Sequence, residues 1–159
     1  MHGGGQPLRS AWRHPDPDLW IVEGQGQTLS AQPIAFDQTE FVSLRPPPAV
    51  NTIAQTGFVY IPSSCQISTG SNCAVHIVFH GCAQGAGEVG DAVYSKVGFN
   101  EWADTNGIIV LYPQLEPTPI FNPLLGCWDW MGYTGPDFMI QSGQQLSAIR
   151  AMVQRLTGQ

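Results

Sequence analysis

The residues most suited to chemistry are His80, Gly81 and Cys82, which directly follow the largely apolar run 74–79. Gly81 allows the backbone to turn sharply after a strand. Ester hydrolysis places negative charge on the former carbonyl oxygen, and each fixed backbone N–H aimed at it is worth about 3 kcal/mol. One interpretation is therefore an oxyanion-binding loop, with the Cys82 amide as donor and with His80 and Gly81 shaping the loop. The alternative is a strand-end histidine that hydrogen-bonds to a neighbouring loop.

A nucleophile to accompany this loop is not identifiable. A serine nucleophile usually lies on a strand-to-helix turn within Gly-x-Ser-x-Gly, and this pentapeptide is absent. Two serines neighbour a glycine, but one is expected in a loop and one in a helix: Ser71 and Ser142. The histidines lie in the N-terminal segment, within an expected strand or in the loop itself, so none suits a catalytic base: His2, His14, His76 and His80. No Ser-His-Asp triad can be assigned, and whether the chain is an enzyme stays open.

The four cysteines fall into two local sets, Cys65 with Cys73 and Cys82 with Cys127. Four cysteines allow three pairings, and sequence alone does not choose among them. A zinc site is disfavoured, because no two cysteines form a C-x2-4-C pair and the nearest histidines lie in a strand pattern. Disulfides and free thiols remain open, and disulfides would indicate an oxidising compartment. We expect no metal and no cofactor.

Strands are expected to position the loop. Residues 57–61, 74–79 and 108–112 have strand character, and the last two are apolar at nearly every position. Such runs are typical of strands buried on both faces of a sheet. Residues 34–36 and 41–42 also look extended, and they precede Pro46-Pro47-Pro48, which favours a stiff polyproline connection.

Helices are expected on either side of the third of these strands. Helical spacing runs from 88 to 105 with a break at Gly98, and Asn106-Gly107 ends it. A second helix is expected over about 138–156, with Asp137 as its cap. The alternation predicts an α/β fold with a parallel sheet of three to four strands and two main helices. Such a sheet would be incomplete, since two double-faced strands need more helical cover than this.

Composition narrows the class of protein. The chain has 159 residues, of which 43% are apolar and 11% charged, which suits one domain with its own core and is familiar from exported enzymes. The net charge of −6 and the scattered basic residues argue against a nucleic-acid partner. No apolar run approaches the roughly 20 residues of a membrane span, and no signal peptide is recognisable. We expect an irregular leader over 1–27, with a short strand at 19–22, and one domain over 28–159.

Five segments together resemble the extracellular poly(3-hydroxybutyrate) depolymerases, most closely the circularly permuted type: Thr56–Pro62, Val78–Gln84, Trp102–Asn106, Val110–Gln114 and Asn122–Trp130. The resemblance runs from about residue 29 to the end of the chain. It implies the carboxy-terminal half of an α/β-hydrolase domain, without the half that carries the nucleophile elbow, in an extracellular or periplasmic protein whose signal peptide is not in this chain.

The resemblance also implies roles for individual residues. Cys82 would provide an oxyanion-hole amide and pair with Cys127, and Cys65 would pair with Cys73. Trp128 and Trp130 would form part of an aromatic wall that binds the polyester. The alternative for these tryptophans is core packing against the Cys82–Cys127 bridge, or one tryptophan in each role.

Two functions fit these observations. The first is a fragment of a carboxylic ester hydrolase that supplies the oxyanion-hole loop and part of the polyester or oligoester cleft, and that is inactive without the missing amino-terminal half. The second is a non-catalytic polyester-binding or relic module. A self-sufficient esterase that uses Ser63 or Ser64 is disfavoured, because a lone serine without a base is a poor nucleophile.

Overall fold

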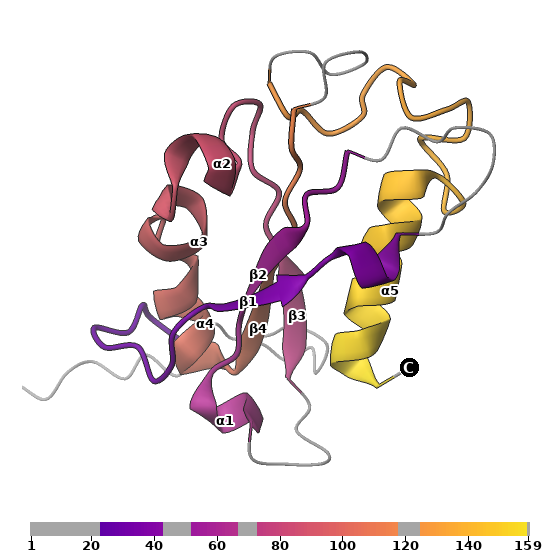
Figure 1. Cartoon of the computed structure of the whole chain (residues 1–159). Helices are drawn as coiled ribbons and strands as arrows, with labels where there is room; N and C mark the ends of the chain where they lie inside the picture. Colours follow the sequence, from indigo (N-terminus) through magenta and orange to yellow (C-terminus); the bar gives the residue numbers. More distant parts are fainter. Residues whose placement is uncertain (1–22, 43–51, 67–72, 118–124, 159) are drawn as a thin grey trace, which may run out of the picture.

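The computed structural model describes residues 23–42, 52–66, 73–117 and 125–158. These residues build a four-stranded sheet with helices on both of its faces (Figure 1). The strands lie in the order β1 (Ile34–Asp37), β2 (Thr56–Tyr60), β4 (Ile108–Tyr112) and β3 (Ala74–Ile77). The strand expected at 19–22 and the polyproline segment lie outside the described residues.

The sheet is mixed, whereas the sequence predicted a parallel one. Strand β3 pairs with β4 in parallel, but β1 pairs with β2 and β2 with β4 in antiparallel fashion. A parallel pair requires a crossover connection, and among the described elements a run of helices provides one only between β3 and β4. The α/β class and the four strands agree with the prediction, whereas two of the three strand pairs are antiparallel and do not.

Strand β4 lies at the centre of the sheet and is buried on both faces. Val110 and Tyr112 face a cluster that includes Tyr60 and Ala103, and Ile109 and Leu111 face a second cluster, as the two-residue period of a strand requires. The expected two-sided burial is wrong for β3, which is only half-buried because it forms the edge of the described sheet. It ends at Ile77, so that the Phe79 side chain is 49% exposed.

The helical segment after β3 covers one face of the sheet. It consists of α2 (Ala86–Val89), α3 (Ala92–Lys96) and α4 (Phe99–Asn106), where the sequence predicted one helix with a single break. Gly90 and Gly98, both with positive φ, separate the three pieces. Gly107 has φ 62° and ends α4, as predicted from Asn106-Gly107. The main chain of Gly26, placed in the expected leader, donates to Glu101 O of α4 at 3.0 Å.

Helix α5 (Gln144–Thr157) covers the opposite face (Figure 1). It begins several residues later than predicted, and Gly143, not Asp137, is its N-cap. Successive tight turns occupy the preceding residues, with Ile140 N–H donating to Asp137 O and Gly143 N–H to Ile140 O. The buried face contains Ala148, Ile149 and Met152, whereas Leu146 is 41% exposed.

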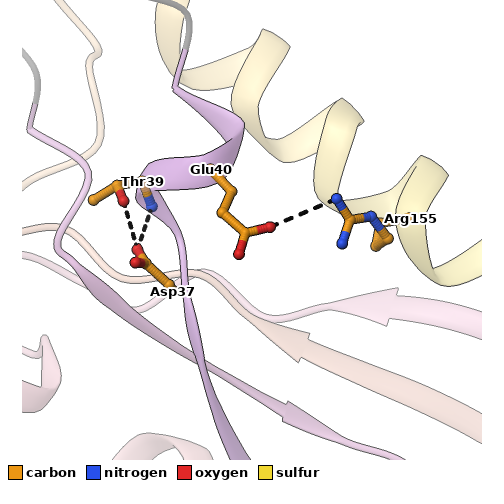
Figure 2. Close-up of polar contacts among 4 residues, drawn as sticks. All are labelled: Asp37, Thr39, Glu40 and Arg155. Atoms are coloured by element: carbon orange, nitrogen blue, oxygen red, sulfur yellow. Dashed lines mark hydrogen bonds and ion pairs between the residues drawn. The ribbon is translucent and has the colours of Figure 1, made fainter.

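Two short helices complete the described chain, η1 (Thr39–Phe41) and α1 (Ser63–Gln66). Helix η1 replaces the extended segment expected at 41–42, because the Asp37 carboxylate accepts hydrogen bonds from Thr39 N–H and Thr39 Oγ1 and stabilises a turn (Figure 2). Glu40 pairs with Arg155 of α5 at 3.6 Å (Figure 2). Of the helices described, none is both long and apolar enough to cross a membrane.

Candidate active-site loop

In the turn formed by residues 81–84, one amide has no acceptor among the described residues. Gly81 N–H donates to Gln84 Oε1 at 3.0 Å, Gln84 N–H donates to Gly81 O at 3.1 Å, and Ala83 N–H donates to Leu125 O. Cys82 is exposed, and its N–H donates to no acceptor in the part of the chain that the structure describes. Ala83 has φ 57°, a left-handed conformation that no other described non-glycine residue adopts. The turn thus leaves the N–H of an exposed residue, Cys82, without an acceptor among the described residues.

His80 is buried beneath this turn, with only 3% of its surface exposed. Its Nδ1 lies 2.8 Å from Gly81 O, and its Nε2 accepts the Leu115 N–H at 3.1 Å. The histidine therefore bonds to a neighbouring loop, as the alternative interpretation expected, and it also contacts the loop that it was expected to shape. Both ring nitrogens are engaged, so His80 does not serve as a base.

Both cysteine sets are disulfide-bonded, and no free cysteine remains. The Cys82–Cys127 bridge joins the oxyanion loop to the segment that carries the tryptophans, with the two Cα atoms 4.3 Å apart. The Cys65–Cys73 bridge connects the end of α1 to the start of β3. These are the pairings that the resemblance implies, and the alternative of free thiols does not apply.

The two candidate tryptophans have different environments. Trp128 is half-buried, and its Nε1 donates to His80 O at 3.1 Å. It also packs edge-to-face on Phe79, with the ring centroids 4.8 Å apart. Trp130 is 72% exposed. A hollow of about 260 Å³ lies beside Trp128, lined by Phe79, Trp128, Asp129, Phe138, Gln145, Leu146 and Ile149. Trp128 is thus a fixed wall of this hollow, and Trp130 is a free surface side chain.

Asp129, between the tryptophans, organises the loop that follows. Its carboxylate accepts five hydrogen bonds, three on Oδ1 and two on Oδ2, from Met131 N–H, Gly132 N–H, Tyr133 N–H, Thr134 N–H and Thr134 Oγ1. Partial burial acts to raise the pKa of Asp129, but the bonds from Thr134 and the backbone outweigh it and lower that pKa. Sequence reasoning missed this role, although an aspartate followed by Gly132 is a recognisable turn signal.

Two buried glutamines, Gln38 and Gln114, connect β1 and β4 to the end of the oxyanion loop through hydrogen bonds. Gln38 is fully buried, donates to Gln114 O at 3.0 Å and accepts from Gln114 N–H at 2.9 Å. Gln114 Oε1 in turn accepts the Ala86 N–H at 2.8 Å and so fixes the start of α2. Sequence reasoning missed the role of both residues, because glutamine is mostly exposed in folded proteins.

A catalytic triad is not assembled by the described residues. His76 is exposed and packs on Phe99 with ring centroids 5.5 Å apart, and no described serine hydroxyl contacts a histidine. Ser71, His2 and His14 lie outside the described residues. In that same part of the chain, no group of three or more His, Cys, Asp or Glu side chains is placed to hold a metal ion.

Comparison with known proteins points to one family. No family model matches the chain. Poly(3-hydroxybutyrate) depolymerase of Delftia acidovorans is 40% identical over 124 residues, which is 78% of this chain and 23% of that protein. Polyhydroxybutyrate depolymerase of Talaromyces funiculosus is 33% identical over 138 residues, which is 81% of this chain and 39% of that protein.

Solved structures agree with the sequence comparison. The crystal structure of PHB depolymerase from Penicillium funiculosum matches with a TM-score of 0.73 and 31% identity, covering 87% of this chain and 45% of that one. A single-residue variant of PHB depolymerase complexed with an R3HB trimer matches equally well. The chain spans less than half the length of each of these proteins. The chain is therefore related in sequence and in structure to part of the poly(3-hydroxybutyrate) depolymerases, which are ester hydrolases with an α/β-hydrolase fold.

Proposed function

We propose that the chain supplies the oxyanion-hole loop of a carboxylic ester hydrolase of the PHB depolymerase type. The observation that carries the proposal is the N–H of the exposed residue Cys82, which has no acceptor among the described residues while the amides of Gly81, Ala83 and Gln84 are all engaged. An oxyanion donor must be free before the reaction and fixed in direction, so that no reorganisation is needed as charge develops.

The chemistry assigns the Cys82 amide one step. A serine oxygen attacks the ester carbonyl carbon, a base takes the serine proton, and the electron pair of the C=O π bond moves onto oxygen. The Cys82 N–H donates to that oxyanion. The base then passes its proton to the departing alcohol, and the carbonyl re-forms as the acyl-enzyme. The bridge to Cys127 limits movement of the amide during these steps.

We further propose that the chain is inactive alone, with the attacking serine and its base supplied by polypeptide outside these 159 residues. The described residues contain no serine–histidine contact, and a serine without a base reacts poorly. In the resembling family the triad belongs to the amino-terminal half, which makes that half the expected partner. Because two disulfides form in oxidising compartments, we place the protein outside the cytoplasm.

For the substrate we propose an oligoester or polyester of a short hydroxy acid. One solved relative is complexed with an R3HB trimer, which supports this class of ligand. The hollow beside Trp128 offers apolar walls for the aliphatic part of such a chain, and Trp130 offers an exposed ring. Esters lack hydrogen-bond donors, so an amide donor beside aromatic walls suits them.

An ester hydrolysis assay tests this proposal. We expect the chain alone not to hydrolyse a soluble short-chain ester, and we expect hydrolysis when it is refolded with the remaining portion of the related fungal depolymerase. A serine-directed phosphonate should abolish that hydrolysis. Phosphonate-sensitive turnover by the chain alone would contradict the inactive-fragment proposal, and failure of every refolded assembly to hydrolyse the ester would contradict the catalytic one.

A non-catalytic polyester-binding module is the second candidate. It is favoured by one segment before α5 that exposes four large apolar side chains: Trp130 72%, Met131 65%, Met139 76% and Ile140 58%. Retention on polyester granules tests it, with Trp128→Ala and Trp130→Ala as variants. Trp102→Ala is the matched control, because Trp102 is 44% exposed but lies on α4. Retention that neither Trp128→Ala nor Trp130→Ala reduces would eliminate the aromatic wall.

A further inference from the structure

We infer that His80 is a positioning residue of the oxyanion loop: its neutral ring, protonated on Nδ1, holds the Gly81–Cys82 peptide so that the Cys82 N–H points away from the protein. The catalytic meaning of this inference rests on the proposed function. The structural part of it, the direction of one amide, is argued from the hydrogen bonds of His80 and of the Gly81–Gln84 turn and does not depend on that function.

The contacts of the ring determine its proton. The partner of Nδ1 is the Gly81 carbonyl oxygen at 2.8 Å, which can only accept, so Nδ1 must carry a hydrogen. The partner of Nε2 is the Leu115 N–H at 3.1 Å, which can only donate, so Nε2 must be bare. Both requirements are met by one species, the neutral Nδ1–H tautomer. The other tautomer would oppose donor to donor at Leu115 and acceptor to acceptor at Gly81.

Two hydrogen bonds to Gly81 O, from His80 Nδ1–H at 2.8 Å and from Gln84 N–H at 3.1 Å, determine the direction of the Cys82 amide. The Gly81 carbonyl and the Cys82 N–H belong to the same planar trans peptide, in which C=O and N–H point in opposite directions. Because the oxygen is drawn toward the buried His80 ring, the N–H is turned away from it, toward the exposed side of the loop. The histidine therefore aims the donor without touching the substrate.

The surroundings of His80 keep the ring from rotating out of this arrangement. The ring is buried, and its own carbonyl oxygen accepts the indole N–H of Trp128. The Trp128 ring lies over it, with centroids 5.6 Å apart. Leu115 belongs to the segment that follows β4 and forms an isolated bridge with Ile53, so its N–H is fixed relative to the sheet. His80 thus links the exposed turn to the sheet, because its ring binds both Leu115 N–H and Gly81 O.

Two substitutions separate the contacts of the ring. The side-chain amide of asparagine can place an N–H near the position of Nδ1, so His80→Asn keeps the donor to Gly81 O and loses the acceptor for Leu115. Glutamine reaches the position of Nε2, so His80→Gln keeps the acceptor for Leu115 and loses the donor to Gly81. If His80 only filled space, the two variants would affect the Cys82 amide alike.

Nuclear magnetic resonance on the 15N-labelled chain tests the inference without any ester. In the unsubstituted chain, long-range 1H–15N spectra of the His80 ring should show a protonated Nδ1 and a bare Nε2. Residual dipolar couplings should give the Cys82 N–H one fixed direction, retained in His80→Asn and reduced in His80→Gln, in which Gln84 N–H alone still binds Gly81 O. The Leu115 amide should exchange with solvent faster in His80→Asn than in His80→Gln.

A proton on Nε2 in the unsubstituted chain would overturn the inference even if neither variant folds. Equal couplings of the Cys82 amide in both folded variants would also overturn it. Hydrolysis by the refolded assembly is a separate readout, in which His80→Gln should lower kcat more than His80→Asn and leave KM unchanged. If no assembly is active but the couplings behave as expected, the proposed function fails and the positioning role of His80 stands.

Discussion

Removal of the Cys82–Cys127 bridge is the perturbation whose effect on stability follows most directly from the structure. The bridge closes a loop with a sequence separation of 45, whereas the Cys65–Cys73 bridge closes one of only 8. A disulfide stabilises mainly by restricting the unfolded chain, and the restriction grows with the logarithm of the loop length. The Cys65–Cys73 bridge, which closes the short loop, is therefore an internal control for removal of the Cys82–Cys127 bridge.

The loop lengths give the magnitudes. With the loop-closure relation at 25 °C, the longer loop is worth about 4 kcal/mol and the shorter about 2.5 kcal/mol. We expect the double variant Cys82→Ala, Cys127→Ala to lose roughly 1.5 kcal/mol more unfolding free energy than Cys65→Ala, Cys73→Ala. We expect this loss of unfolding free energy to destabilise the whole domain and not one loop, because the longer loop contains α2 to α4 and the central strand β4.

Urea unfolding followed by tryptophan fluorescence measures both losses, with the slope m checked for each variant so that a change in the unfolded state is recognised. Non-reducing mass mapping of the unsubstituted protein confirms that both bridges are closed at the start. Equal losses, or a larger loss for the short loop, would refute the reasoning from loop length.

The other predictions concern the supports of the loop. Gln38→Ala should lower the unfolding free energy by about 3 kcal/mol or more, because it leaves buried backbone groups of Gln114 unpaired; the exposed control Gln141→Ala should change it by less than about 0.5 kcal/mol in the same urea assay. The lowered pKa of Asp129 means that its stabilising contribution is complete above the unfolded-state value of 3.8 and is lost as pH falls through the folded-state pKa. Unfolding free energy measured from pH 6 to pH 2 should therefore fall less steeply in Asp129→Asn, and an unchanged slope would contradict the role of the carboxylate. At Ala83, where φ is 57°, glycine should change the unfolding free energy by less than about 1 kcal/mol, whereas the β-branched valine should lower it by more than glycine does, as thermal unfolding can show.

Much of the fold follows from local sequence signals. The strand at 108–112 matches β4 exactly in its bounds, because five consecutive apolar residues between a glycine and a proline have few other options. The start of α5 was missed, because the predicted first residues of the helix instead form successive turns, in which Ile140 N–H donates to Asp137 O and Gly143 N–H donates to Ile140 O. The antiparallel placement of β2 beside β4 depends on contacts distant in sequence, for which no local pattern exists.

The candidate site, like the fold, contains residues that local sequence signals predict and residues that they do not. His80, Gly81 and Cys82 could be singled out because a glycine-containing loop follows a strand, and the exposed position of Cys82 suits the role proposed for its amide. The tautomer of His80 could not be predicted, because it depends on Leu115, 35 residues further along the chain. The glutamine pair Gln38 and Gln114 was equally hidden, since its two members are separated by 76 residues.

The central claim is that the Cys82 N–H binds the developing oxyanion, and two substitutions at that residue test it most directly. Cys82→Ala and Cys82→Pro both lose the disulfide, but only proline loses the N–H, and proline suits the second position of the Gly81–Gln84 turn. In the assembly refolded with the remainder of the fungal depolymerase, ester turnover by Cys82→Pro should be lower than that by Cys82→Ala by about 10²-fold to 10³-fold. Equal turnover by the two folded variants would contradict the claim.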